Sequence, residues 1–141
     1  MNELSASFLY AQLQRRGKIY QKRKVQWQTY YNELTCLEKE GKAYIQHIPM
    51  YANPNSHIFY LICKNFKERA KLITHLHKKG VNAVFHNQSL HKSTYYVDKH
   101  DGRNLPNADR YTNCLLRLPL YFELSSEQQS EVVHAIISFY K

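Results

Sequence analysis

Two histidines, His86 and His91, close a segment whose residue types could contact a ligand. The segment begins at Gly80, and glycine is the residue that most often ends a helix. The β-branched and aromatic residues that follow, Val81 to Phe85, are typical of a short strand. Loops just past a strand end often carry binding groups, and an imidazole can donate, accept or change charge near neutral pH. Ligand contact and a purely structural role, in which both histidines cap the strand, explain this pattern about equally well.

The other candidate chemical groups do not form a site in the sequence. The chain has eight histidines, but His75 and His77 are two apart on an expected helix and do not face one partner. Its three cysteines are far apart and odd in number, which favours reduced structural thiols over a disulfide framework. The sequence has no glycine-rich phosphate loop and no nucleophile motif. We therefore expect no catalytic residue and no metal ligand in this chain.

Composition limits the class of protein. The 141 residues, 43% of them apolar, suffice for one domain with a core. No apolar run is long enough for a membrane span and the N-terminus is unlike a signal peptide, so we expect a cytoplasmic protein without a membrane partner. The net charge is +9, and the densest basic run is Arg15–Lys24. A solvated helix face is its commonest explanation, and an acidic partner domain or a phosphorylated ligand is the alternative.

Periodicity predicts an α+β fold with a long N-terminal helix and a small mixed or antiparallel sheet whose helices cover one face. The first helix spans about 2–37, bent or divided at Gly17. Capping boxes at Asn65 and Ser125 start two later helices, and Asn107 starts a short one ending at Cys114. We expect Phe66, Ala70, Ile73 and Leu76 to face inward on the second helix, and Val132, Val133, Ile136, Ile137 and Tyr140 on the last. The expected strands are 43–49, 57–63, 81–85 and 115–121, with a long irregular stretch at 92–107.

Three separated motifs resemble those of the DegT/DnrJ family of pyridoxal-phosphate sugar aminotransferases. The first is Gly80–His91, which is similar to a family signature that ends in two histidines. The second is Arg117–Tyr121 followed by the helix start at Leu124–Gln128, and the third is the N-terminal stretch Asn2–Leu13. Their order matches the family's and they span nearly the whole chain.

The resemblance implies the small C-terminal domain of a fold-type-I pyridoxal-phosphate transferase. Residues 1–40 would be a connecting helix and residues 41–141 a small α+β domain, with the large cofactor-binding domain absent. His86 would face a nucleotide sugar at the active-site mouth, with Asn87 and His91 beside it. Pyridoxal phosphate belongs to the complete enzyme, and we expect none bound to this chain alone. The implied partners are the missing large domain or a homo-dimer partner, which would cover the aromatic stripe around Phe8, Trp27 and Tyr31.

Two positions depart from the family pattern. Asn87 replaces a tyrosine, which removes an aromatic wall from the substrate side, and Ser89 replaces a proline, which loosens the loop. We therefore expect a C-terminal fragment of a sugar-nucleotide aminotransferase of surface-glycan or lipopolysaccharide biosynthesis, inactive by itself. The alternative is a stand-alone basic interaction module derived from this domain. Nucleic-acid binding through the Arg15–Lys24 helix is the third and weakest of the three hypotheses.

Overall fold

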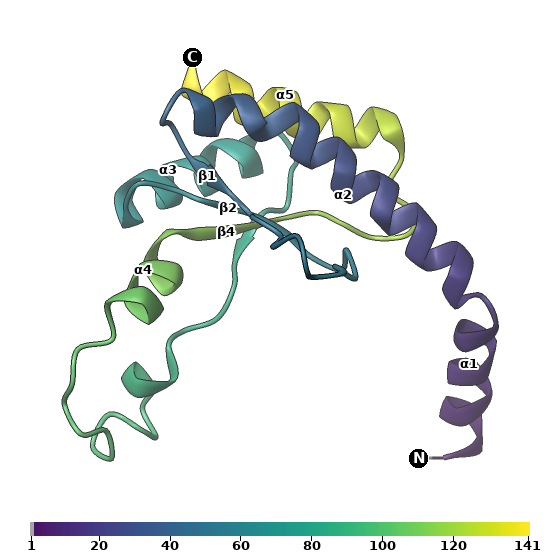
Figure 1. The fold of residues 1–141 in the computed structure, drawn as a ribbon, viewed down its shortest axis with the longest axis horizontal. Helices are drawn as coiled ribbons and strands as arrows, with labels where there is room; N and C mark the ends of the chain where they lie inside the picture. Colours follow the sequence, from purple (N-terminus) through teal and green to yellow (C-terminus); the bar gives the residue numbers. More distant parts are fainter. Residues whose placement is uncertain (1) are drawn as a thin grey trace.

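A computed structural model describes residues 2–141 (Figure 1). The elements in chain order are the helices α1 (Glu3–Gln14) and α2 (Arg16–Lys39), the strands β1 (Tyr44–Ile45) and β2 (Phe59–Ile62), the helix α3 (Phe66–Lys78), the strand β3 (Val84–Phe85), the 3-10 turn η1 (Leu90–Lys92), the helix α4 (Pro106–Cys114), the strand β4 (Leu115–Leu118) and the helix α5 (Ser126–Tyr140).

The four strands form one antiparallel sheet in the order β1-β2-β4-β3. Strands β2 and β4 are central, with Phe59 opposite Leu118 and Ile62 opposite Leu115. The short edge strand β3 pairs through Val84 and Phe85 with β4. The predicted α+β class, with a small antiparallel sheet, is therefore confirmed.

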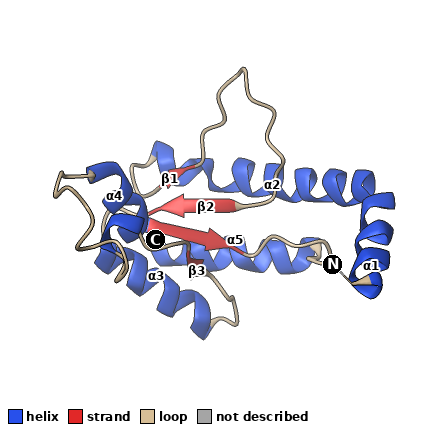
Figure 2. Ribbon diagram, turned by 90° about the horizontal axis from the view of Figure 1, so that it is seen from below, coloured by secondary structure: helices blue, strands red, loops and turns tan. Residues whose placement is uncertain are grey.

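Helices α2, α3 and α5 cover one face of the sheet, whereas α4 and the segment before it extend from the opposite side (Figures 1 and 2). The core forms where α2 and α5 cross the central strands. Phe59 is fully buried there and its ring contacts those of Trp27 and Tyr30 at centroid distances of 5.4 and 5.3 Å. The Tyr30 hydroxyl donates to the Pro119 carbonyl at 2.9 Å, which satisfies the one polar atom of that ring.

Helix ends follow the sequence signals closely. The side chains of Asn65 and Ser125 accept from the backbone of Glu68 and Gln128, so both residues are N-caps as predicted. The reciprocal bond of a capping box is present at Ser125, whereas the Glu68 carboxylate accepts the Tyr140 hydroxyl instead. Gly80 closes α3 with a φ of +76°, as Val81 N–H donates to Leu76 and Gly80 N–H to His77. That pair of hydrogen bonds is the Schellman motif, which a left-handed glycine permits.

Several predicted boundaries are wrong. The first helix breaks at Arg15, two residues before Gly17, and the strands are shorter than predicted. Helix α4 begins at Pro106 with Leu105 as its N-cap, so Asn107 does not cap it. Proline favours the first helical position because its fixed φ suits the helix and its missing N–H leaves nothing unpaired there.

The inward face of α3 also differs from the prediction. Phe66 is 53% exposed and Ala70 is exposed, whereas Arg69, Leu72 and Leu76 are buried. The buried stripe is therefore rotated by about one residue from the predicted one, because Arg69 takes an inward position. On α5 the prediction holds: Val132, Val133 and Ile136 are buried, and Ile137 and Tyr140 pack against the core.

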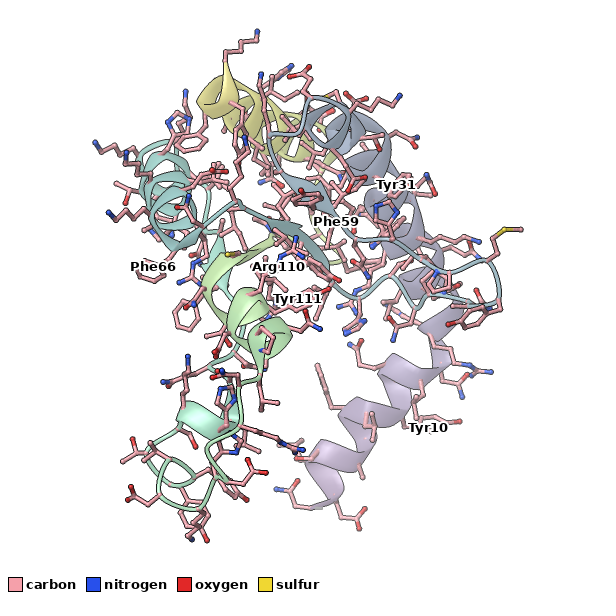
Figure 3. The ribbon with its side chains drawn as sticks, turned by 60° about the vertical axis from the view of Figure 1, so that its left-hand side comes forward. Tyr10, Tyr31, Phe59, Phe66, Arg110 and Tyr111 are labelled. Atoms are coloured by element: carbon pink, nitrogen blue, oxygen red, sulfur yellow. The ribbon has the colours of Figure 1, made fainter. Side chains whose placement is uncertain are left out.

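Helix α1 stands apart from this core. None of its residues is buried, and Phe8 is 70% exposed. Figure 3 shows Tyr10 on this helix, away from Tyr31 and Phe59 in the core region. Of the aromatic stripe that we expected a partner to cover, the α1 part around Phe8 is bare, whereas Trp27 is buried and stacks on Tyr31 at 5.3 Å. Within residues 2–141, no helix is both long and apolar enough to cross a bilayer.

Candidate ligand-binding site

A hollow of about 510 Å³ lies between the loop after β3, the segment that follows it and helix α4. The loop contributes one wall and α4 the other, because Arg117 and Leu116 of β4 pair with β3 and so bring the two chain segments to the same edge of the sheet. The hollow is lined by His86, Asn87, Gln88, Ser89, Leu90, His91, Tyr96, Lys99, His100, Arg103, Leu105, Ala108, Tyr111, Thr112 and Leu115.

Helix α4 gives the hollow an apolar wall. Ala108 and Tyr111 lie one turn apart on α4, and the flanking residues Leu105 and Leu115, at its N-cap and C-cap, extend this apolar side at intervals of three and four. In Figure 3, Tyr111 and its neighbour Arg110 lie on α4, across a gap from α1. Apolar surface with a few convergent polar groups is the usual composition of small-molecule sites.

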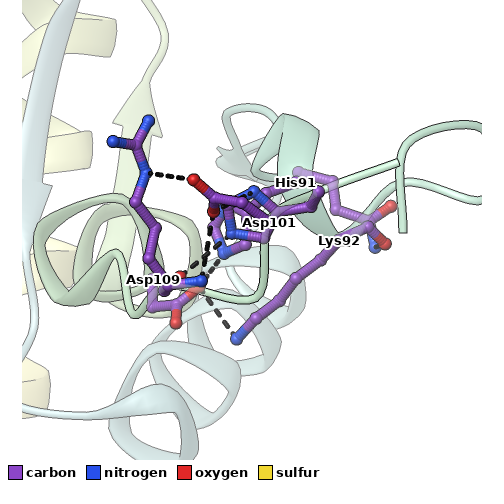
Figure 4. A network of polar contacts seen from close by, with 7 residues as sticks. His91, Lys92, Asp101 and Asp109 are labelled. Atoms are coloured by element: carbon purple, nitrogen blue, oxygen red, sulfur yellow. Dashed lines mark hydrogen bonds and ion pairs between the residues drawn. The ribbon is translucent and has the colours of Figure 1, made fainter. Parts of the chain in front are cut away.

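Asp109 fastens the loop to α4. Its Oδ1 forms ion pairs with Lys92 Nζ at 2.8 Å and with His91 Nε2 at 3.1 Å (Figure 4). The hydrogen bond from Lys92 holds the pKa of Asp109 below its usual value, and the charges of Lys92 and His91 add to the effect. His91 therefore lines the hollow with one ring nitrogen already occupied by this carboxylate.

His100 and Asp101 organise the far side of the segment. His100 Nε2 lies 3.0 Å from the Arg103 carbonyl, and its Nδ1 lies 3.4 Å from Asp101. Asp101 also receives the Arg103 backbone N–H at 3.1 Å and pairs with its guanidinium at 3.4 Å. The ring centroids of His91 and His100 are 5.2 Å apart, so the contacts around Asp109 and those around Asp101 lie next to each other.

Arg69 supports α4 from behind. It is 8% exposed, and its Nη1 donates to the Thr112 carbonyl at 2.6 Å. Its guanidinium lies over the rings of Phe66 and Phe85, at 5.1 and 5.7 Å from their centroids. One side chain of α3 thus joins α4 to β3, the two elements that carry the walls of the hollow.

His86 lies at the rim of the hollow. Arg117 Nη1 lies 3.5 Å from its Nδ1, and the Asn87 side-chain nitrogen lies 3.4 Å from its Nε2. Both neighbours are donors, so a ring with one protonated nitrogen can accept from only one of them. The loop also holds Ser89, which is 9% exposed and whose Oγ has no hydrogen-bond partner among residues 2–141.

The structure places all three predicted contact residues, His86, Asn87 and His91, around this one hollow. Their contact with a ligand stays a prediction. Sequence reasoning missed Lys99 and Arg103, which lie in the irregular stretch at 92–107; its unusual length was the only signal. Across the described chain, no three histidine, cysteine, aspartate or glutamate side chains gather as a metal site.

The hollow is cationic. Lys99, Arg103 and three imidazoles line it, and among residues 2–141 no carboxylate does. The acidic groups nearby, Asp101 and Asp109, are turned toward basic partners. An anion with an apolar portion complements these walls, because charge-assisted hydrogen bonds can hold the anion while α4 covers the rest.

Comparison with known proteins agrees with this architecture. A family model described as the DegT/DnrJ/EryC1/StrS aminotransferase family matches residues 1–137, so the chain belongs to that family. The family predicted from the sequence motifs is thereby confirmed.

Three solved structures share the fold. They are DesV of S. venezuelae in complex with a ketimine intermediate (21% identity, TM-score 0.90, 100% of this chain and 37% of that one); PseC of Helicobacter pylori, an aminotransferase involved in the biosynthesis of pseudoaminic acid (18%, 0.86, 99% and 38%); and Spr1654 of Streptococcus pneumoniae in its PLP form (22%, 0.87, 99% and 36%). The chain thus spans little more than a third of each of these proteins.

Proposed function

We propose that this chain forms the small domain of a pyridoxal-phosphate-dependent sugar-nucleotide aminotransferase and that its hollow receives the nucleotide sugar. The observation that carries the proposal is the convergence of His86, Asn87 and His91 with Lys99 and Arg103, in a member of this aminotransferase family. The diphosphate of a nucleotide sugar would lie against Lys99 and Arg103, where no carboxylate lines the hollow, and its flat base would lie against the apolar side chains of α4.

The chain's own residues would bind and orient that substrate. Lys99 and Arg103 neutralise the diphosphate, and Arg103 is held ready by its pairing with Asp101. His86, at the rim of the hollow, contacts a sugar oxygen through its ring edge. His91, fixed by Asp109, positions the loop and offers its ring face rather than that nitrogen.

The described residues do not fit pyridoxal phosphate by themselves. That cofactor needs an imine-forming lysine, a carboxylate for its ring nitrogen and a phosphate cradle. In the hollow, the ammonium of Lys99 lies 3.5 Å over the Tyr95 ring. The carboxylates nearby are already engaged, Asp109 by Lys92 and His91 and Asp101 by Arg103. The cofactor would therefore be held by a large aminotransferase domain, and this chain would be inactive without it.

Helix α1 supports such a partner. It exposes Leu4, Phe8, Tyr10 and Leu13 and buries none of its residues. An apolar helix of this kind is covered when a large domain or a homo-dimer partner packs on it. Residues 1–40 would then be the connecting segment and residues 41–141 the small domain, in a cytoplasmic enzyme.

The particular reaction that the motifs favour is amination of a dTDP-4-keto-6-deoxyhexose to dTDP-4-amino-4,6-dideoxygalactose, for surface glycans such as lipopolysaccharide. The support is the closeness of Gly80–His91 and Arg117–Tyr121 to the motifs of that transaminase. It predicts that the hollow prefers dTDP to GDP.

Titration calorimetry with dTDP tests the binding step. The pair Lys99→Ala and Arg103→Ala should weaken dTDP binding at least about tenfold, because two charge-assisted hydrogen bonds are lost. The matched pair Lys18→Ala and Lys24→Ala removes the same charge from α2 and should change it less than about twofold. Equal losses from both pairs would contradict the site. Undetectable dTDP binding would make the stand-alone interaction module the better function.

A further inference from the structure

The outer face of α3 carries a straight basic ridge, formed by Lys67, Lys71, Thr74 and Lys78. At 100° per residue these positions fall within about 60° of one another around the helix axis. The three lysines are exposed. None takes part in the six ion pairs among residues 2–141.

A hollow of about 510 Å³ continues the ridge at the start of α3. Lys42 and Lys64 line it together with Lys67 and Lys71, and Glu68 is its one acidic lining residue. The Glu68 carboxylate accepts the Tyr140 hydroxyl at 2.9 Å and forms no ion pair with those lysines. Lys42 pairs with Glu40 at 2.7 Å, which leaves three lysines at this end of the ridge that form no ion pair among residues 2–141.

We propose that the ridge is a docking surface for an extended acidic segment of a partner protein. Lys67 and Lys71 are separated by about 6 Å along the helix, and alternate side chains of an extended chain repeat every 6.6–6.8 Å or so. Carboxylates on alternate residues of such a segment therefore match Lys67 and Lys71, and Lys78 lies about 10.5 Å further along the helix, about the length of three extended residues. The segment's end reaches the hollow at the start of α3, where Phe139 and Tyr140 offer aromatic surface.

Two other polyanions fit this face less well. A helix that binds a lipid surface inserts an apolar face, but Leu72 and Leu76 of α3 are fully buried in the core. Surfaces for single-stranded nucleic acid combine positive charge with aromatic rings on which bases stack. The rings beside the ridge are already engaged, because Phe66 lies against the Arg69 guanidinium and the Phe139 and Tyr140 rings pack edge to face at 5.0 Å.

The ridge is separate from the proposed substrate site. Its lysines lie on the side of α3 opposite Arg69, which contacts α4 and Phe85. Substitutions on the ridge should therefore leave dTDP binding unchanged, so that the two proposals can fail independently.

Fluorescence anisotropy with a labelled peptide of about eight residues, in which glutamate alternates with serine, tests the docking surface. The triple variant Lys67→Gln, Lys71→Gln and Lys78→Gln should bind the peptide at least about tenfold more weakly than the unaltered chain. The control triple Arg15→Gln, Lys18→Gln and Lys24→Gln removes equal charge from the other basic run and should change binding less than about twofold. Equal losses from the two triples, or no peptide binding at low salt, would overturn the proposal. Tighter binding of oligouridylate or of phosphatidylserine vesicles than of the peptide would overturn it too.

Discussion

Replacing Arg69 by methionine should destabilise the fold, because this side chain connects α3 with α4 and β3. The substitution keeps most of the aliphatic length and removes the guanidinium. One hydrogen bond from a charged donor to the Thr112 carbonyl is lost, worth about 1.5–3 kcal/mol. Contacts with the Phe66 and Phe85 rings add about 0.5–1 kcal/mol each. Methionine also removes a buried charge, whose Nε has no hydrogen-bond partner, and the desolvation cost avoided offsets part of this loss. The net loss in the free energy of unfolding is then about 2 kcal/mol.

Urea unfolding followed by Trp27 fluorescence measures this loss. Trp27 is the chain's single tryptophan and is 6% exposed, so its emission reports the core directly. With a urea dependence of about 2 kcal/mol per molar, the midpoint of Arg69→Met should fall by about 1 M. Arg15→Met, at the exposed break between α1 and α2, serves as the control and should stay within about 0.5 kcal/mol of the unaltered chain. An Arg69→Met midpoint equal to that of the control would refute the role given to the guanidinium.

Three further predictions address the core, the loop and the thiols. Phe59→Ala should lower the free energy of unfolding by about 3–5 kcal/mol in the same urea assay, because it opens a cavity at a fully buried position; a loss below about 1 kcal/mol would contradict that packing. The lowered pKa of Asp109 means that its charged form is stabilised in the fold, so this stabilisation is present above about pH 4 and is lost as the pH falls below it. Asp109→Asn should accordingly weaken the acid dependence of the thermal midpoint between about pH 5 and 3, and an unchanged acid dependence would count against the network. Burial raises the pKa of the Cys63 thiol to about 11, so a thiol reagent at neutral pH should label Cys36 first and reach Cys63 and Cys114 only on unfolding, whereas early labelling of Cys63 would contradict its burial.

Sequence patterns located the helices best where a chemical signal marks their ends. The Asn65 and Ser125 caps and the Gly80 stop depend on local hydrogen bonds, which the sequence specifies within a few residues. The inward face of α3 could not be predicted in the same way. Arg69 reads as a surface residue, and its burial depends on a carbonyl of Thr112, far away in the sequence.

The candidate site shows a similar division. His86 and His91 stand out because they follow a strand, and the structure does place them around one hollow. Lys99 and Arg103 lie in a segment that Asp109 folds back onto α4 by pairing with His91 and Lys92. Such long-range pairing has no periodic signature, so only the length of the segment hinted at a function.

Amide chemical-shift mapping of dTDP binding on the ¹⁵N-labelled chain tests the central claim most directly. The account predicts that the largest shifts fall on the loop from His86 to His91 and on the segment around Lys99 and Arg103, with the α3 ridge unaffected. Shifts centred on Lys67–Lys78, or no shifts at saturating dTDP, would contradict the assignment of the hollow as the nucleotide-sugar site.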